Sequence, residues 1–382
     1  MQEKTNNYKN ELHSICTYLA MFPHNIPHEY IKKYTNKGDI VYDPFSGRGT
    51  TILESLLLER KAIGNDLAPL AYVLTRAKTI NDNLNKIIKR VNKLKKEYDQ
   101  WKNINKIDLN NKDFKDVKYF YSENNLNQLF FLREKIGKNY KKLDKINNFI
   151  LAIALGLMHG QIRKDNSTIY FSISMPNGYS MSPNYVKNYK NKYNLILPET
   201  NIFEQIIDRV LVKLKNNKIN NLKLESKIFN KDALKSKEFI RKEKPKLIFT
   251  SPPYLNAVNY VEQNWLRYWL LGFNKEENKN IKLDDKHSKE KYKNFLKNFI
   301  VEMEKILDQN GKLIIVIGDL KNKKIKIEEI IKEIILNIKN LKISEEIKKE
   351  KINLKLSRQM GKSKEGKLIN YDWYFIIEKK EE

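Results

Sequence analysis

The chain has a single cysteine, Cys16, among its 382 residues. One cysteine excludes a framework of disulfides and any zinc site built on cysteine ligands, so the composition fits a reducing compartment. The five histidines are dispersed along the chain and form no convincing cluster of metal ligands, and we therefore expect no metal. We expect Cys16 itself to be a small buried apolar residue rather than a nucleophile.

Apolar runs long enough to cross a bilayer are also missing. Residues 1–10 are polar and charged and lack the apolar core of an export signal. We therefore expect a soluble, cytoplasmic protein. A hydrophobic content of 41% is nevertheless enough for a substantial core, in one large domain or in two of ordinary size.

Acidic residues are scarce relative to basic ones: 46 Asp and Glu stand against 73 Lys and Arg, which gives a formal net charge of +27. Such a charge favours close, salt-dependent approach to a polyanion, and nucleic acid is the obvious partner. The lysines also fit the compositional bias of an AT-rich genome, spread as an ordinary solvated surface. Charge alone leaves both interpretations open, so the motifs must decide.

Two short strings far apart in the chain each follow an apolar, strand-like run. The first, Asp-Pro-Phe-Ser-Gly-Arg-Gly-Thr at residues 43–50, follows the run 39–42 and opens a helix-like segment. The second, Thr-Ser-Pro-Pro-Tyr at residues 250–254, follows the run 246–249. Because the carboxyl ends of parallel strands face one crevice in an open α/β sheet, we expect the two strings to form complementary halves of one site.

The two ends of the chain alternate between strand-like and helix-like patterns, whereas the middle does not. We predict an α/β catalytic domain with a seven-stranded, mostly parallel sheet, made of residues 1–75 and 222–382, and a largely helical insertion at residues 76–221. The expected strands are residues 39–43, 61–66, 224–229, 246–250, 312–317, 343–354 and 374–377. The expected helical patterns include residues 51–59, 84–101, 126–158, 233–240, 261–271, 292–307 and 325–338.

The two strings resemble motif I and motif IV of the amino-methyltransferases that modify exocyclic nitrogens of DNA bases. Three further segments resemble motifs of the same family: residues 13–23 followed by Pro27 resemble motif X, residues 64–71 resemble motif II, and residues 230–233 resemble motif III. The resemblance implies a class I methyltransferase (Rossmann-like) fold and S-adenosylmethionine as the methyl donor. It also implies that the insertion is the target-recognition region.

The resemblance assigns the first string and the acids after it to the methyl donor. Gly47 and Gly49 would let the backbone pass close to the methionine part of the donor, and the following helix would present free N–H groups to its carboxylate. Asp43 would pair with the donor's ammonium group, unless it only caps the turn. Asp66 would accept hydrogen bonds from the ribose hydroxyls, and Asp232 would bind the adenine amine. The predicted donor-binding residues are Asp43, Pro44, Phe45, Gly47, Gly49, Thr50, Asp66, Asp232 and Phe22.

The second string would hold the amine that receives the methyl group. The Ser251 hydroxyl and the Pro252 carbonyl would accept both amine hydrogens and aim the nitrogen lone pair at the methyl carbon. Pro252 and Pro253 would stiffen the loop and remove competing backbone donors, and Tyr254 would stack on the base. We therefore predict Ser251, Pro252, Pro253 and Tyr254 as the catalytic residues.

A base inside a duplex cannot reach such a pocket, so the target must be flipped out or already single-stranded. Asn256 and Tyr260 would line the flipped-base pocket. Ser180 and Asn184 lie in residues 170–185, the least lysine-rich part of the insertion, where hydroxyls, amides and aromatics would contact base edges. The alternative for this segment is a buried loop in which Pro, Gly and Ser only shape turns.

Serine in the first position of motif IV is typical of the cytosine-N4 branch, whereas the adenine-N6 branch more often has Asp or Asn. We therefore predict site-specific methylation of cytosine N4 in double-stranded DNA, in a restriction-modification or related defence system with a separate restriction endonuclease. Adenine-N6 methylation and RNA base methylation are the alternatives, although the chain lacks the aromatic sheet signature of an added RNA-binding module. A catalytically silent DNA-binding protein is disfavoured, because binding alone does not need motifs I and IV.

Overall fold

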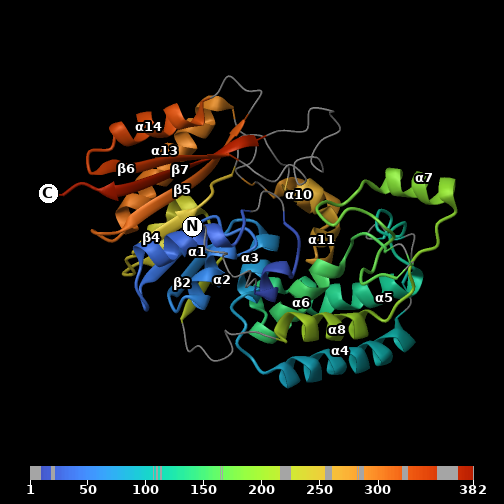
Figure 1. Cartoon of the computed structure of the whole chain (residues 1–382). Helices are drawn as coiled ribbons and strands as arrows, with labels where there is room; N and C mark the ends of the chain where they lie inside the picture. The colour runs from blue at the N-terminus through green and yellow to red at the C-terminus, as the bar shows by residue number, and fades with distance from the viewer. Residues whose placement is uncertain are drawn as a thin grey trace. The chain divides into compact units, whose positions relative to one another are not determined.

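The chain forms two compact units, seen in the computed structural model of Figure 1. The sheet unit consists of Asn25–Thr75, Lys223–Tyr260 and Lys282–Glu382, and the helical unit consists of Met1–His24, Arg76–Leu222 and Val261–Ile281. The structure describes residues 10–18, 22–105, 107–108, 111, 114–163, 165, 167–215, 225–253, 260–281, 283, 288–320, 326–350 and 369–381.

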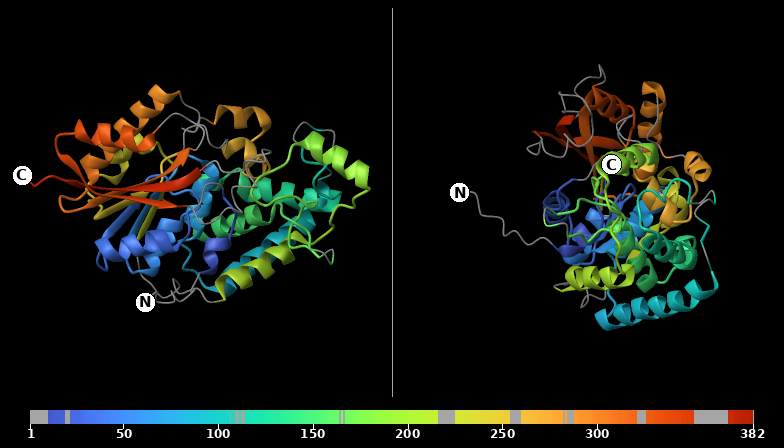
Figure 2. Two further views of the ribbon diagram at one scale, coloured as in Figure 1. Left: turned by 45° about the horizontal axis from the view of Figure 1, so that its top comes forward. Right: turned by 90° about the vertical axis from the view of Figure 1, so that its right-hand side faces the viewer.

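The sheet unit is built on seven strands. They are β1 Ile40–Asp43, β2 Lys61–Asn65, β3 Ser226–Phe229, β4 Leu247–Thr250, β5 Lys312–Leu320, β6 Leu341–Glu350 and β7 Ile369–Lys379. Their order across the sheet is β3-β2-β1-β4-β5-β7-β6. Figures 1 and 2 show the strands of this sheet with helices packed against them. The first five run parallel, and β7 is antiparallel to both β5 and β6. The predicted seven-stranded, mostly parallel sheet is confirmed.

Both faces of this sheet are covered, which explains why its central strands read as continuous apolar runs. All four residues of β4 are buried. One face packs against α9 (Ser236–Ile240), α13 (Lys289–Ile306) and α14 (Ile327–Leu336) in one apolar cluster. The other face packs against α1 (Asn25–Tyr34), whose Tyr30 ring lies 5.6 Å from the ring of Phe249 in β4.

Three further helical segments join the strands of the sheet unit. They are α2 Thr50–Leu57, α3 Pro69–Ala77, which runs on across the boundary into the helical unit, and the 3-10 turn η5 Ala233–Lys235. α2 follows β1 and precedes β2 in the chain, and it packs on both strands and on α1. This arrangement brings the start of α2 to the carboxyl end of β1, where the first predicted string lies.

The helical unit has its own core around α6 (Lys145–Leu157), in which every residue from Asn148 to Leu155 is buried. α6 packs against two long amphipathic helices, α4 and α8. The other elements are η1 Glu11–Ser14, α4 Leu84–Ile104, α5 Glu123–Leu132, η2 Arg133–Gly137, η3 Tyr140–Lys142, α7 Pro183–Tyr193, α8 Ile202–Leu214, α10 Tyr260–Gln263, which begins at the boundary, α11 Trp265–Leu270 and α12 Lys275–Asn280. Cys16 is buried in this unit, as predicted. None of the described helices combines the length and the apolar character needed to cross a bilayer.

Two predicted helical patterns are broken in the structure. The pattern over 126–158 is interrupted after Gly137, where a Cβ atom would overlap the carbonyl of Leu270. The next long helix, α6, begins at Lys145, and Asp144 is its N-cap. The pattern over 261–271 is interrupted at Asn264, whose side chain accepts a hydrogen bond from the Arg267 guanidinium at 2.7 Å. A tertiary contact thus accompanies the break after Gly137, and a local side-chain hydrogen bond accompanies the break at Asn264.

Candidate active site

A glycine-bearing turn leads from β1 into α2 at the carboxyl edge of the sheet. Gly47 and Gly49 have φ angles of +53° and +76°, in the left-handed region where glycine carries no Cβ penalty. A Cβ on Gly49 would lie 2.8 Å from the Cα of Thr75, and the Thr75 hydroxyl donates to the Gly47 carbonyl at 3.1 Å. The turn therefore needs glycine at position 49. The first N–H groups of α2, which begins at Thr50, lack helical acceptors and are available to a carboxylate.

Asp43 is the last residue of β1 and is only 1% exposed. Burial raises the pKa of its carboxyl group to about 6, although hydrogen bonds from the Thr250 hydroxyl and the Phe45 N–H favour the charged form. These donors lie 2.7 Å and 3.2 Å from Oδ1. A buried carboxylate held by neutral donors gains most from a cationic partner, which is the chemistry expected of a group that binds an ammonium.

Asp66 directly follows β2 and is joined to the same turn. Its carboxylate accepts hydrogen bonds from the N–H of Gly47 at 2.8 Å and from the N–H of Ala68 at 2.9 Å. Burial raises the pKa of this carboxyl group to about 7. These two N–H groups leave further lone pairs on the carboxylate oxygens, which could accept the hydrogen bonds predicted from the ribose hydroxyls of the donor.

Two asparagines that sequence reasoning missed connect this edge of the sheet. Asn65 is fully buried, and its amide donates to the carbonyls of Pro44 at 3.2 Å and of Lys231 at 3.0 Å. The Asn230 amide donates to the Asp66 carbonyl at 2.8 Å. For Asn65, the sequence signal was a polar side chain at the buried end of a largely apolar strand, which needs partners when buried.

Motif IV begins at the carboxyl end of β4, next to β1. Thr250 ends the strand, Ser251 is half-buried and Pro252 is buried. The carbonyl of Pro253 accepts a hydrogen bond from the Tyr292 hydroxyl at 2.9 Å. Tyr292 is a fully buried residue of α13, so a core helix holds the start of the loop. The structure therefore brings the start of motif IV to the motif I turn.

Three of the predicted donor residues have structural contacts of their own. Asp232 caps η5 by accepting a hydrogen bond from the Leu234 N–H at 2.9 Å. Phe45 packs against Phe299 of α13, with ring centroids 5.0 Å apart. Pro44 is buried and offers its carbonyl to Asn65. Their roles toward the donor stay predictions.

The residues predicted to hold the base are divided between the units. Tyr254 and Asn256 lie outside the described residues, and Tyr260 begins α10. Ser180 belongs to the helical unit, as does Phe22, which was predicted to bind the methyl donor. These assignments also stay predictions.

Ser180 and Asn184 have different surroundings within the helical unit. Ser180 is buried, with its hydroxyl 3.2 Å from Nε2 of His159 and its N–H donating to the Gln263 carbonyl. Burial lowers the pKa of His159 well below its usual value, so this pair is neutral. Asn184, in the first turn of α7, is exposed and accessible to a partner.

The sheet order, with antiparallel β7 between β5 and β6, together with a glycine turn after β1 and an acid after β2, defines a class I methyltransferase. The model of a DNA methylase family of N6 and N4 enzymes matches residues 1–76 and 245–382. The chain belongs to this family. It is therefore a DNA methyltransferase, and its methyl donor is S-adenosylmethionine.

Individual relatives agree with the family. The chain is 25% identical over 398 residues to the type II methyltransferase M.MjaII of Methanocaldococcus jannaschii, a match that covers 81% of this chain and 72% of that protein. It is 43% identical over 49 residues to the orphan methyltransferase M.BamHII of Bacillus amyloliquefaciens, covering 13% of this chain and 18% of that one. Among solved structures, an rRNA methylase from Streptococcus thermophilus is 7% identical with a TM-score of 0.35 and coverage of 95% and 99%, too distant to add to the assignment.

Proposed function

We propose that the protein transfers the methyl group of S-adenosylmethionine to N4 of cytosine at a specific sequence of double-stranded DNA. The observation that supports one shared site is the hydrogen bond between Thr250 and Asp43, which joins the start of motif IV to the motif I turn. The observation that favours cytosine is Ser251 at the first position of motif IV, because this residue is typical of the cytosine-N4 branch.

The donor would lie along the carboxyl edge of β1, β2 and β3. Asp43 would receive its ammonium group, and the free N–H groups at the start of α2 its carboxylate. Asp66 would accept hydrogen bonds from the ribose hydroxyls, and Asp232 from the adenine amine. When bound, S-adenosylmethionine supplies an electrophilic methyl group on a positively charged sulfur.

The amine nitrogen of cytosine is a weak nucleophile because its lone pair is delocalised into the ring. The Ser251 hydroxyl and the Pro252 carbonyl would accept its two hydrogens, which favours tetrahedral geometry and aims the lone pair at the methyl carbon. Tyr254 would stack on the ring. Pro253 would fix the loop through its carbonyl, which Tyr292 holds from α13.

The base must leave the double helix to reach these groups, so we propose that the target cytosine is flipped out of the duplex. Asn256, Tyr260, Ser180 and Asn184 would contact the target or its flanking bases. The similarity to a type II methyltransferase supports a role beside a separate restriction endonuclease. A cytoplasmic location stays a prediction from the low cysteine content.

A direct test is to incubate the purified protein with duplex DNA and donor carrying a labelled methyl group, and to digest the product to nucleosides. The proposal predicts label in N4-methylcytosine. Label in N6-methyladenine would contradict the choice of base, and label that appears only when RNA is supplied would contradict the choice of polymer.

Variants separate the two halves of the site. Ser251→Ala should abolish methyl transfer while donor affinity, measured by calorimetry, stays close to that of the unmodified protein. Asp66→Ala should instead weaken donor binding, because it removes the acceptor predicted for the ribose hydroxyls. Equal loss of donor affinity in both variants would contradict the assigned roles.

A further inference from the structure

The helix α7 of the helical unit carries a stripe of three exposed tyrosines. Tyr185, Tyr189 and Tyr193 recur at intervals of four residues and are 51%, 40% and 53% exposed. Neighbouring rings are in contact, with centroids 5.9 Å and 4.8 Å apart. Val186 is the one buried residue of this helix, so the tyrosines do not serve the core. Exposed aromatic residues gathered on one face mark an interaction surface.

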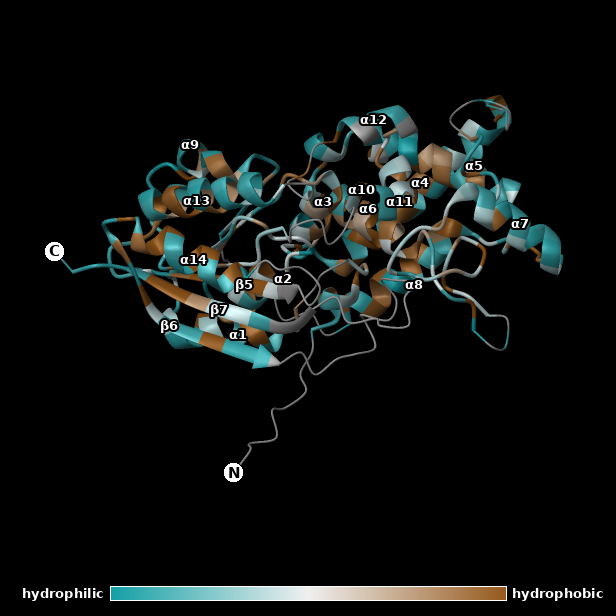
Figure 3. Ribbon diagram, turned by 90° about the horizontal axis from the view of Figure 1, so that it is seen from above, coloured by the Kyte–Doolittle hydropathy of each residue, from teal (hydrophilic) through white to brown (hydrophobic). Residues whose placement is uncertain are grey.

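The charged side chains of α7 itself are all positive. Lys187, Lys190 and Lys192 lie on the same helix, and no Asp or Glu occurs in the sequence between Asp165 and Glu199. The Lys192 ammonium lies 5.2 Å from the centre of the Tyr193 ring. α7 is drawn mainly in the hydrophilic colours of Figure 3, in keeping with a helix that meets water on most sides. An anionic partner therefore meets no repulsion from the charges of α7 itself.

We propose that this surface, the tyrosines Tyr185, Tyr189 and Tyr193 with the three lysines of α7, docks the DNA substrate. The lysines would neutralise backbone phosphates, and the tyrosine hydroxyls would donate hydrogen bonds to phosphate oxygens. The rings would pack on sugars and on exposed bases. The inference rests on the family's DNA substrate and is independent of which amine is methylated.

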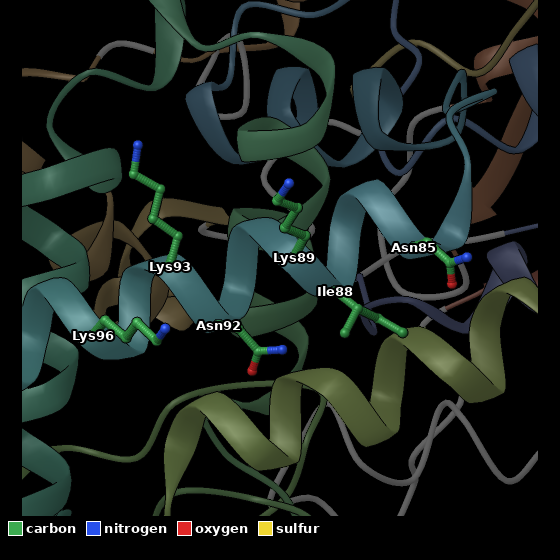
Figure 4. Close-up of a pocket in the computed structure, with 6 residues that line it drawn as sticks. All are labelled: Asn85, Ile88, Lys89, Asn92, Lys93 and Lys96. Atoms are coloured by element: carbon green, nitrogen blue, oxygen red, sulfur yellow. The ribbon is translucent and has the colours of Figure 1, made fainter.

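A second basic surface on α4 provides a matched comparison. A shallow hollow of ≈ 470 Å³ is lined there by Asn85, Ile88, Lys89, Asn92, Lys93 and Lys96 (Figure 4). The three lysines of this hollow are exposed, and α7 has the same number of lysines. Its lining includes no aromatic ring, and the acids Glu97 and Asp99 follow directly on the same helix. Replacing either lysine set by alanine removes the same charge from the helical unit.

The test measures the affinity of the full-length protein for a fluorescent DNA duplex over a series of salt concentrations. We expect the combined variant Lys187→Ala, Lys190→Ala and Lys192→Ala to lose about tenfold or more in affinity near physiological salt. The slope of log Kd against log salt should fall by up to about 3, because one counterion is released for each phosphate contact. The α4 variant, with Lys89, Lys93 and Lys96 replaced, should keep its slope.

The tyrosines are tested separately, because loss of a ring does not change the charge. Tyr189→Ala should weaken DNA binding, Tyr189→Phe should keep the part of the affinity that depends on ring packing, and both should leave donor affinity unchanged, which shows that the protein is folded. Equal losses in the α4 and α7 lysine variants would overturn the proposal, as would α7 changes that impair only RNA binding or only self-association. Duplex binding without any cytosine methylation would refute the proposed function and leave this surface assignment intact.

Discussion

The hydroxyl of Thr250 donates a hydrogen bond to the carboxylate of Asp43 across 2.7 Å, although 207 positions separate the two residues. They are the last residues of two neighbouring parallel strands, β4 and β1. The bond favours the charged form of an acid whose burial favours the neutral form. The start of motif IV thus influences the ionisation of the group expected to bind the donor's ammonium.

Thr250→Val keeps the shape of the side chain and removes this hydrogen bond. Because the bond lowers the pKa of Asp43, we expect its loss to raise that pKa above about 6 and to shift the acid limb of donor binding to higher pH. Calorimetric titration of the donor between pH 5 and 8 measures the shift. Thr79→Val, which removes a hydroxyl bonded to the Arg76 carbonyl, is the matched control and should leave the profile unchanged. An unaltered profile in Thr250→Val would contradict the coupling.

The pH dependence of stability follows from the same acids. Burial raises the pKa of Asp43 to about 6 and that of Asp66 to about 7, above their usual value of 3.8. Between about pH 4 and 7 the folded protein therefore binds more protons at these groups than the unfolded chain, and their contribution to stability falls as pH rises. For Asp43, raising the pKa by about two units lowers the free energy of unfolding at pH 8 by about 3 kcal/mol.

Asp43→Asn isolates this contribution. The variant should unfold at a higher temperature than the unmodified protein at pH 8, with the difference shrinking toward pH 4, and it should bind donor poorly at both. Thermal unfolding with and without donor measures both effects, since a bound ammonium stabilises the ionised acid only in the unmodified protein. A melting-temperature difference that does not depend on pH would contradict the raised pKa.

Gly49→Ala tests the close approach of the glycine turn to α3. The new Cβ would lie 2.8 Å from the Thr75 backbone at a φ of +76°, so we expect a loss of about 2 kcal/mol in unfolding free energy or more, together with weaker donor binding. Gly38→Ala is the control, because Gly38 also has a positive φ, +85°, but its Cβ would have no neighbour within 4 Å. Chemical denaturation compares the two. Equal losses would mean that φ alone, and not the contact with Thr75, is responsible.

Tyr292→Phe removes the hydroxyl that holds the Pro253 carbonyl. We expect slower methyl transfer with unchanged donor affinity, because the motif IV loop would be less well positioned. Tyr30→Phe is the control: Tyr30 is also buried, and its hydroxyl has no hydrogen-bond partner among the described residues. Single-turnover kinetics and donor calorimetry separate the steps. A parallel loss of donor affinity in Tyr292→Phe would show that the phenol supports the whole edge of the sheet.

The sequence was sufficient to predict the strands and the proximity of the two motifs. Buried parallel strands such as β4 are apolar up to their last residue, and their carboxyl ends were visible as polar residues followed by turn formers. It was not sufficient to predict the bonds of Asn65, because its partners Pro44 and Lys231 lie 21 and 166 positions away. The break after Gly137 coincides with a tertiary contact to Leu270, and the break at Asn264 with a local hydrogen bond to Arg267; helical periodicity encodes neither.

The division of the chain into two compact units also depends on long-range contacts, and not only on the order of segments in the sequence. The catalytic domain of residues 1–75 and 222–382 stays a prediction, whereas the contacts of the chain group Val261–Ile281 with the helical unit. Buried side chains on α11, such as Tyr268 and Trp269, supply part of that unit's core. Long-range packing of this kind leaves no periodic signal, so a boundary at residue 261 could not be predicted from the sequence.

The most direct test of the account is single-molecule sequencing of plasmid DNA from a methylation-deficient bacterial host that expresses the protein. We predict N4-methylcytosine at one recurring short sequence, and none in DNA from cells that express Ser251→Ala at the same level. N6-methyladenine in its place, or an unmodified plasmid despite folded protein that binds the donor, would contradict the account.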